Sequence, residues 1–250
     1  MDLRAGHGDL LERPGARRQC GRRQHRAGCG RRPHLRARRR REQVLERATY
    51  HHGDLRNALV GAATTAVRAG GPDGLALREV AREVGVSPNA AYRHFAGRAD
   101  LLATVAEHAR GAMGAAMAER LAAVPPDDEA LALARARLAA VGRGYVEWAV
   151  AEPGLFGVAF GAPPEAAKVD GPPGCVGGPD PWSMLQERLA ELDAARGLGP
   201  RGRDGADTTA WAGVHGLAVL LIGPLAGLGP AEREVALARV LATVGAGLAA

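Results

Sequence analysis

A group of polar and aromatic residues follows the sequence Gly-Val-Ser at residues 85–87. Asn89 carries an amide that can pair with base edges in the major groove of DNA. Tyr92, His94 and Arg98 follow, and a helix N-terminus at this place would present free N–H groups and a dipole that favour phosphate. By themselves, Tyr92 and His94 are better explained by ordinary packing at a helix surface or in a core. Whether these residues bind DNA therefore depends on the secondary structure that positions them.

Those elements are predicted to be three helices. Apolar residues recur at steps of three and four from Leu55 to Val67, which indicates an amphipathic helix that begins near His52 and ends at Gly70. A short helix over residues 77–84 should stop at Gly85, a residue that tolerates a left-handed turn. Ser87 is suited to cap the next helix, which has Pro88 at its first position and should run to about Phe95. Two short helices joined by a tight turn and supported by a third form the helix-turn-helix pattern.

The stretch Leu77–Val105, LREVAREVGVSPNAAYRHFAGRADLLATV, closely resembles the signature of the TetR/AcrR family of transcriptional regulators. In that signature Tyr-x-His-Phe follows the turn, and a basic residue stands three places later. Here Tyr92, His94, Phe95 and Arg98 have these spacings. The resemblance implies an all-α homodimer with an N-terminal helix-turn-helix domain that binds an operator in double-stranded DNA and a C-terminal domain that binds an effector. One short reading helix per subunit implies a near-palindromic operator.

The resemblance also implies which residues contact DNA. The reading positions fall on Ser87, Pro88, Asn89 and Ala90, and the phosphate positions on Tyr92, His94 and Arg98. Arg78, on the preceding helix, is a further candidate for a phosphate contact. The sequence departs from the family pattern at Ala76, where a capping Thr or Ser is usual, and at Ala91, where a larger apolar residue is usual.

Beyond Arg98 the pattern is helical to the end of the chain. We expect helices over residues 98–122, 128–151, 181–196, 207–222 and 231–248, with a long Gly- and Pro-rich loop over 161–181 and no strand. The segment Gly144–Gly161 and the later Trp211, His215 and Gly216 resemble a TetR C-terminal type called the WHG domain. This second resemblance covers residues 101–250.

A pocket for a small apolar effector would be concave, mostly apolar and enclosed by these helices. The candidate ligand-binding residues are Tyr145, Trp148, Phe156, Phe160 and His215. Each of them could instead be plain core, and His215 could also be a hydrogen-bonding group of a subunit interface. Two further helix faces are expected to pair with their symmetry mates in a four-helix bundle that holds the dimer together. One consists of Trp211, Val214, His215, Ala218, Leu221 and Ile222, and the other of Leu237, Leu241, Val244 and Leu248.

The charge is distributed unevenly along the chain. Residues 1–49 hold fifteen arginines and five acidic residues, a net charge of +10, whereas the remainder has a net charge of −4. We therefore expect a disordered Arg-rich tail over 1–49, a DNA-binding domain over 50–100 and an effector-binding and dimerisation domain over 101–250. Residues 1–43 could be dispensable, with Val44 a possible true start.

Other functions are less compatible with the sequence. A Gly-rich phosphate loop, G-x-S-x-G, H-E-x-x-H and a catalytic carboxylate pair are all missing, so we expect no enzyme and no cofactor. The possible metal ligands of the tail are Cys20, His25, Cys29 and His34. They lack C-x-x-C spacing, so no metal site is expected.

Without a signal peptide or a long apolar run, the chain is expected to be cytoplasmic and not bound to a membrane. The main alternative is a nonspecific nucleic-acid-binding protein that acts through the basic tail. A second is a helical scaffold that does not bind DNA.

Overall fold

A computed structural model describes residues 55–161 and 177–250, which belong to one compact unit, Ala48–Ala250. Every regular element in these two ranges is a helix, so the all-α prediction is confirmed. The predictions for the tail, residues 1–49, and for most of the loop 161–181 lie outside the described residues. No described helix is long and apolar enough to cross a membrane.

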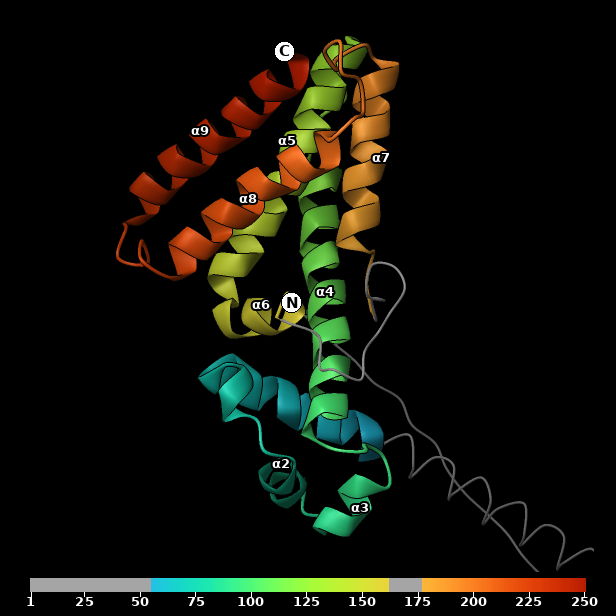
Figure 1. The fold of residues 1–250 in the computed structure, drawn as a ribbon, viewed down its shortest axis with the longest axis vertical. Helices are drawn as coiled ribbons and strands as arrows, with labels where there is room; N and C mark the ends of the chain where they lie inside the picture. The colour runs from blue at the N-terminus through green and yellow to red at the C-terminus, as the bar shows by residue number, and fades with distance from the viewer. Residues whose placement is uncertain (1–54, 162–176) are drawn as a thin grey trace, which may run out of the picture. The chain divides into compact units, whose positions relative to one another are not determined.

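The first elements are a helix over 55–70, the 3-10 turn η1 (Pro72–Gly74) and the short helices α2 (Leu77–Glu83) and α3 (Pro88–Tyr92) (Figure 1). Gly85, in the turn between α2 and α3, has a φ of 79°, which explains why glycine is suited to this position. The Ser87 side chain accepts a hydrogen bond of 3.3 Å from the backbone N–H of Ala90, so the predicted cap of α3 is confirmed. Helix α3 ends at Tyr92, three residues before the predicted end.

Six helices follow: α4 (Arg98–Ala122), α5 (Ala130–Ala151), α6 (Pro153–Ala159), α7 (Pro181–Ala194), α8 (Ala206–Ile222) and α9 (Pro230–Ala249). The five long ones lie within two residues of their predicted bounds. The sequence analysis did not predict α6, because it took Pro153-Gly154 only as a break. Proline is well tolerated at the first position of a helix, and Pro153 begins α6 in this way.

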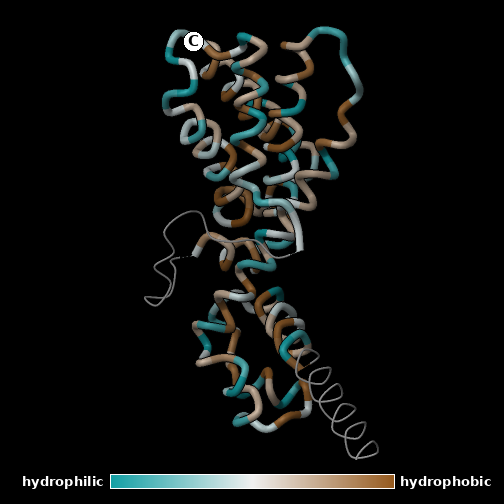
Figure 2. The backbone as a smooth tube through the Cα atoms, turned by 90° about the vertical axis from the view of Figure 1, so that its right-hand side faces the viewer, coloured by the Kyte–Doolittle hydropathy of each residue, from teal (hydrophilic) through white to brown (hydrophobic). Residues whose placement is uncertain are grey.

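Helix α5 packs against α4, α7, α8 and α9, and hydrophobic stretches alternate with hydrophilic ones along the helices (Figure 2). Glycine allows the closest approach. A Cβ added at Gly144 of α5 would lie 2.7 Å from the Cα of Met117 in α4, so only glycine fits there without movement of α4. This packing fixes the position of α5 relative to α4.

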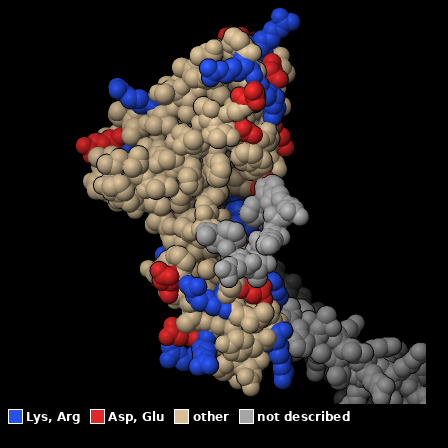
Figure 3. Space-filling model, viewed as in Figure 1, with Lys and Arg blue, Asp and Glu red and all other residues tan. Residues whose placement is uncertain are grey.

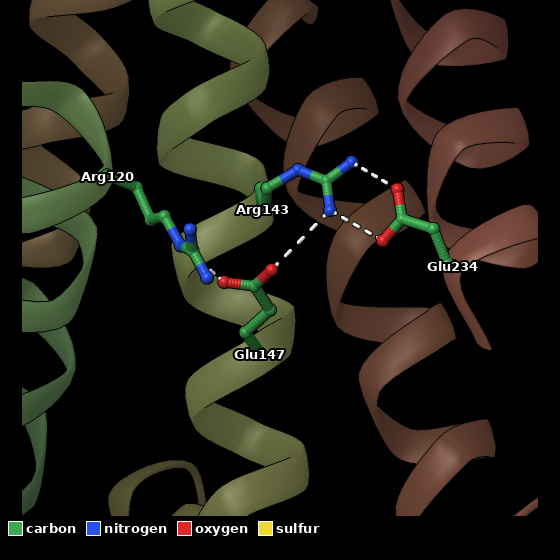
Figure 4. Close-up of polar contacts among 4 residues, drawn as sticks. All are labelled: Arg120, Arg143, Glu147 and Glu234. Carbon is green, nitrogen blue, oxygen red and sulfur yellow. Dashed lines mark hydrogen bonds and ion pairs between the residues drawn. The ribbon is translucent and has the colours of Figure 1, made fainter. Parts of the chain in front are cut away.

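Charged side chains join α9 to α5 at one edge (Figure 4). Arg143 donates to both carboxylate oxygens of Glu234, at 2.7 and 2.8 Å, and also to Glu147 at 3.4 Å. Arg120 of α4 donates to Glu147 at 2.6 Å. The Arg143 guanidinium lowers the pKa of the Glu234 carboxyl, mainly through these hydrogen bonds. Three helices are therefore linked by one alternating network of charges.

The structure corrects the predicted interface faces of α8 and α9. Val214, Ala218 and Leu221 of α8 are buried in the core of the subunit itself, as are Leu237 and Leu248 of α9. They lie on the inner faces because each helix covers α5 or its neighbours with its apolar stripe. A dimer interface would need the opposite faces.

Candidate DNA-reading surface and effector cavity

The N-terminal end of α3 presents its side chains outward. Ser87, Pro88 and Asn89 are exposed, and Tyr92 is 46% exposed. On the opposite side, Ala91 is fully buried. The helix therefore packs against the core at this position although the side chain is smaller than the apolar residue that is usual there. The exposed edge thus holds the predicted reading residues, and the buried edge fixes α3 on the core.

The other predicted DNA contacts surround this edge. Arg78 on α2 is exposed, and His94 and Ala90 are half-buried. Arg98 has a further role that the sequence did not predict, since its Nε donates to the carbonyl of Leu75 at 2.9 Å and its Nη2 to that of Pro72 at 2.6 Å. These bonds tie the start of α4 to the segment that precedes α2. A phosphate contact from Arg98 stays a prediction.

Arg56 is a positioning residue that sequence reasoning missed. Its guanidinium carbon lies 4.9 Å from the centroid of the Phe95 ring, and its Nη2 is 3.5 Å from the Thr104 hydroxyl. Phe95 follows the reading helix and is only 1% exposed. Arg56 therefore connects the helix 55–70 with the end of the reading segment and with α4. No regular spacing in the sequence predicts this contact between Arg56 and the Phe95 ring.

A cavity of about 1000 Å³ lies among α4, α5, α7, α8 and α9. Of the predicted ligand-binding residues, Tyr145 and Phe160 line it, together with Trp182 and Trp211. Phe156 and His215 lie beside these rings rather than among the lining residues, and Trp148 is a buried core residue, 8% exposed. Contacts of Trp148, Phe156 or His215 with a ligand stay predictions.

The rings next to the cavity form one aromatic cluster. The Tyr145 hydroxyl lies 2.7 Å from Nδ1 of His215 and accepts a hydrogen bond of 3.3 Å from the Trp211 indole N–H. Phe160 lies 5.7 Å from Tyr145 and 5.3 Å from His215 between ring centroids. Burial raises the pKa of the Tyr145 hydroxyl and lowers the pKa of His215. The neutral hydroxyl can therefore donate to Nδ1 of a neutral imidazole.

Helix α6 connects this cluster with the DNA-reading part of the chain. Phe156 and Phe160, at 5.3 Å from each other, come from α6 and its C-terminal end. At the other end of α6, Glu152 accepts a hydrogen bond of 2.6 Å from Arg68 of the helix 55–70. A Cβ on Gly154 would lie 2.4 Å from the carbonyl oxygen of Val67, so α6 packs directly on the backbone of that helix.

Two family models match the chain. Residues 59–105 match the one described as bacterial regulatory proteins, tetR family, and residues 138–244 match the tetracyclin repressor-like C-terminal domain. A solved protein of unknown function from Rhodococcus sp. RHA1 is 31% identical, over 80% of this chain and 98% of the other, with a TM-score of 0.65. The chain belongs to the TetR family.

A TetR variant from Acinetobacter baumannii AYE, solved in complex with minocycline, is 20% identical to this TetR-family chain. That likeness covers 76% of this chain and 93% of the other, with a TM-score of 0.52, and supports the fold alone. No curated protein matches the sequence.

The two family matches cover the reading helix and most of the cavity lining of this TetR-family protein. The N-terminal match contains α2 and α3 with Tyr92, so the protein is a DNA-binding transcriptional regulator. TetR-family regulators are typically not enzymes. The C-terminal match contains Tyr145 and the residues Trp211 and His215, on which the WHG resemblance rests.

Sequence reasoning missed several cavity residues. Trp182, at the start of α7, has its ring centroid 5.8 Å from that of Trp211, and Arg110 and Arg135 line the cavity from α4 and α5. Trp182 directly follows Pro181 at a helix start, which is a weak signal for a site. In the sequence, Arg110 and Arg135 cannot be distinguished from surface arginines, because only packing decides which of them a neighbouring helix covers.

Proposed function

We propose that this regulator is a homodimeric repressor that acts in the cytoplasm and releases its operator when a small, largely apolar effector binds. The observation that carries this proposal is that an exposed reading helix and a cavity of about 1000 Å³ occur in one compact unit, joined by α4 and α6. A volume of this size suits an organic molecule.

The DNA contacts proposed are those of the exposed edge of α3 and its surroundings. Ser87, Pro88, Asn89 and Ala90 would face base edges in the major groove, with Asn89 as the main hydrogen-bonding group. Arg78, Tyr92, His94 and Arg98 would face phosphates. Arg98 can serve phosphate only in addition to its bonds to the carbonyls of Pro72 and Leu75.

Two of these reading helices are needed for a site of useful length. In a symmetric dimer they would lie about 34 to 36 Å apart, or at a larger spacing that fits the groove repeat, so the operator should be a near-palindrome. The outer face of α8 supports such a dimer, because Val219 and Leu220 are 44% and 45% exposed there. Figure 3 shows a broad uncharged surface over α8.

The effector would act through the helices that leave its cavity. Tyr145 and Phe160 line the cavity, and Phe160 directly follows α6, whose other end rests on the helix 55–70. Arg110 and Met117 line it from α4, which continues to Arg98 next to the reading segment. A ligand that shifts α4 or α6 would change the separation of the two reading helices without touching DNA.

Footprinting on the DNA around the regulator's own gene would test the proposal. We expect protection of one near-palindrome at physiological salt, and its loss when an effector from a panel of small apolar molecules is added. By linkage, that effector must bind less tightly to the operator complex by the same factor, which calorimetry with and without operator measures. Equal effector affinities in the two states would refute a ligand-responsive repressor.

The alternative function gives a different result in the same assay. A nonspecific binder that acts through the tail would protect no defined site, and a variant that begins at Val44 would lose its affinity for DNA. A specific repressor would keep its footprint in that variant, although its nonspecific affinity would fall.

A further inference from the structure

Aromatic side chains are concentrated at the cavity. The chain has three residues each of Trp, Tyr and Phe, and four of these line the cavity: Trp182, Trp211, Tyr145 and Phe160. Their rings form a continuous row. Ring centroids are 5.7 Å apart for Tyr145 and Phe160, 6.1 Å for Phe160 and Trp211, and 5.8 Å for Trp211 and Trp182. The row comes from α5, the C-terminal end of α6, α8 and α7, so four elements build one aromatic wall.

The aromatic wall offers a ligand mainly the faces and edges of rings. The Tyr145 hydroxyl lies 2.7 Å from Nδ1 of His215 and accepts a hydrogen bond of 3.3 Å from the Trp211 indole N–H, so these polar atoms already have partners. Aromatic rings prefer offset or edge-to-face contacts with one another, as Trp182 makes with Trp211 at an interplanar angle of 77°. Such contacts stabilise beyond the area that they bury, and a saturated ring cannot make them.

The charged residues of the lining do not require a charged ligand. They are Arg110, Arg135, Arg143 and Asp180. Arg143 is paired with the carboxylates of Glu147 and Glu234. Arg110 donates to the carbonyl of Ala159 at 3.1 Å, and it and Asp180 each make a further interaction within the protein. Arg135 is exposed to water. A charged ligand would therefore lose its hydration on entering the cavity without meeting a buried charge that lacks a partner.

The size of the cavity suits more than one ring. Helix α9 contributes small residues to the lining, namely Ala238, Ala242, Gly245, Ala246 and Ala249, and the volume is about 1000 Å³. An apolar cavity of about 150 Å³ is enough to bind one benzene molecule. Protein interiors are otherwise close-packed, so a volume of this size beside an aromatic wall favours a ligand with several rings.

We propose that the cavity binds neutral polycyclic aromatic compounds, that is, planar uncharged molecules with two or more fused rings. The rings of the ligand lie against Phe160, Trp182 and Trp211. This assignment rests on the proposed function, in which the same cavity holds the effector, and it narrows the effector to one chemical class.

Two alcohols of the same skeleton test the aromatic character on the unaltered full-length protein. They are 2-naphthol and its saturated analogue decahydro-2-naphthol, whose affinities calorimetry measures at pH 7. Burial of apolar area alone favours the saturated alcohol, because it has the larger apolar surface. We expect 2-naphthol to bind at least about fivefold more tightly, because only its rings make the aromatic contacts. Equal or tighter binding of the saturated alcohol, or no binding of either, overturns the proposal.

Two charged probes with the naphthalene ring test the neutral character in the same assay. They are 2-naphthoate and 2-naphthylmethylammonium. Both should bind at least about tenfold more weakly than 2-naphthol, because each must leave water without gaining an unpaired partner. A charged probe of either sign that binds as tightly as 2-naphthol overturns the neutral class.

Two variants of α7 test the position of the ligand rings. Trp182→Leu keeps an apolar side chain but removes a ring, and it should reduce the preference for 2-naphthol over the saturated alcohol at least about threefold. The matched control is Leu185→Ala, which shortens an aliphatic residue of the same lining. It should weaken both alcohols alike and keep the preference. A preference that is unchanged in Trp182→Leu, or lost in Leu185→Ala, overturns the role of the aromatic wall. If Trp182→Leu does not fold, the four probes on the unaltered protein still decide the ligand class.

The operator separates this inference from the proposed function. If 2-naphthol binds with the expected preference but leaves operator affinity unchanged, the ligand class stands and the ligand-responsive repressor fails. If the saturated alcohol or a charged probe weakens operator binding and 2-naphthol does not, the repressor stands and the neutral aromatic class is overturned.

Discussion

The Tyr145 hydroxyl lies between two nitrogen groups, with the indole N–H of Trp211 at 3.3 Å and Nδ1 of His215 at 2.7 Å. A neutral His215 with an unprotonated Nδ1 can accept the proton of the Tyr145 hydroxyl, while the hydroxyl oxygen accepts from Trp211. Three side chains from α5 and α8 are thereby held together by one proton arrangement.

This arrangement predicts a dependence of stability on pH. Burial lowers the pKa of His215 in the folded protein below 6.5, so the unfolded chain binds a proton first as the pH falls. The contribution of His215 to stability is therefore complete above about pH 6.5 and is lost as the pH falls through the lower folded pKa. His215→Asn keeps an acceptor for Tyr145 but cannot titrate. Thermal unfolding of both proteins between pH 7.5 and 5.5 should show a smaller decrease for the variant, and equal decreases would contradict the prediction.

Residues of the reading helix are expected to separate into two classes. Asn89→Ala should relax base preference at particular operator positions by roughly 1 to 3 kcal/mol, because it removes a hydrogen-bonding amide from the groove. Tyr92→Phe should weaken binding to all sequences alike, because a phosphate contact carries no base information. Fluorescence anisotropy with a set of single-base operator variants measures both. If the base preference is unchanged in Asn89→Ala, sequence-dependent DNA shape is the main source of specificity.

Among the elements, α6 is short but has contacts at both ends. Its C-terminal end carries Phe160 into the cavity lining, and its N-terminal end rests on the helix 55–70 through Gly154 and the ion pair of Glu152 with Arg68. The ion pair is largely exposed and contributes little to stability, whereas the glycine contact involves backbone atoms that cannot move aside. We therefore expect packing at Gly154 to determine where α6 lies.

Gly154→Ala tests this contact. The added Cβ would lie 2.4 Å from the carbonyl oxygen of Val67, so α6 must shift, and we expect a loss of about 1 to 3 kcal/mol in the free energy of unfolding. The effect of an effector on operator affinity should decrease as well. Gly157→Ala is a matched control on the same helix, with no atom within 4 Å of the added Cβ, and should stabilise the protein slightly. Urea unfolding that shows no difference between the two variants would refute the role of Gly154.

For the whole molecule, we expect the exposed face of α8 to form the interface of the proposed dimer. Asp207 is the one acidic residue of this helix and His215 the one basic residue, and its outward side bears Val219 and Leu220. A largely apolar surface of this kind is a typical site of subunit association. We expect it to pair with its symmetry mate across a twofold axis.

A charge on this face should prevent that pairing. Leu220→Glu, at a position that is 45% exposed, should give the mass of a monomer in light scattering, while Ala190→Glu on the exposed side of α7 should not. Operator affinity should fall more than about a hundredfold in Leu220→Glu, since a single reading helix covers only half of the site. A Leu220→Glu protein that remains dimeric would show that another face holds the subunits together.

The sequence alone determined the local structure of this protein. Periodicity placed the five long helices, and Gly85, Ser87 and Pro88 defined the turn and the cap of the reading helix, because such signals depend on residues a few positions apart. For the same reason the sequence could assign Ser87, Pro88 and Asn89, which are exposed, to the start of the reading helix.

The tertiary structure decided which faces and distant residues meet. In the folded chain, Val214 and Leu221 lie in the core rather than at an interface, and residues 153–159 form α6. Arg110 and Trp182, which are far apart in the sequence, line one cavity. An apolar stripe predicts that a helix is covered but not by what, since a core helix and an interface helix have the same period. The partners of a stripe depend on the packing of all the helices together, and this packing exists only in the folded chain.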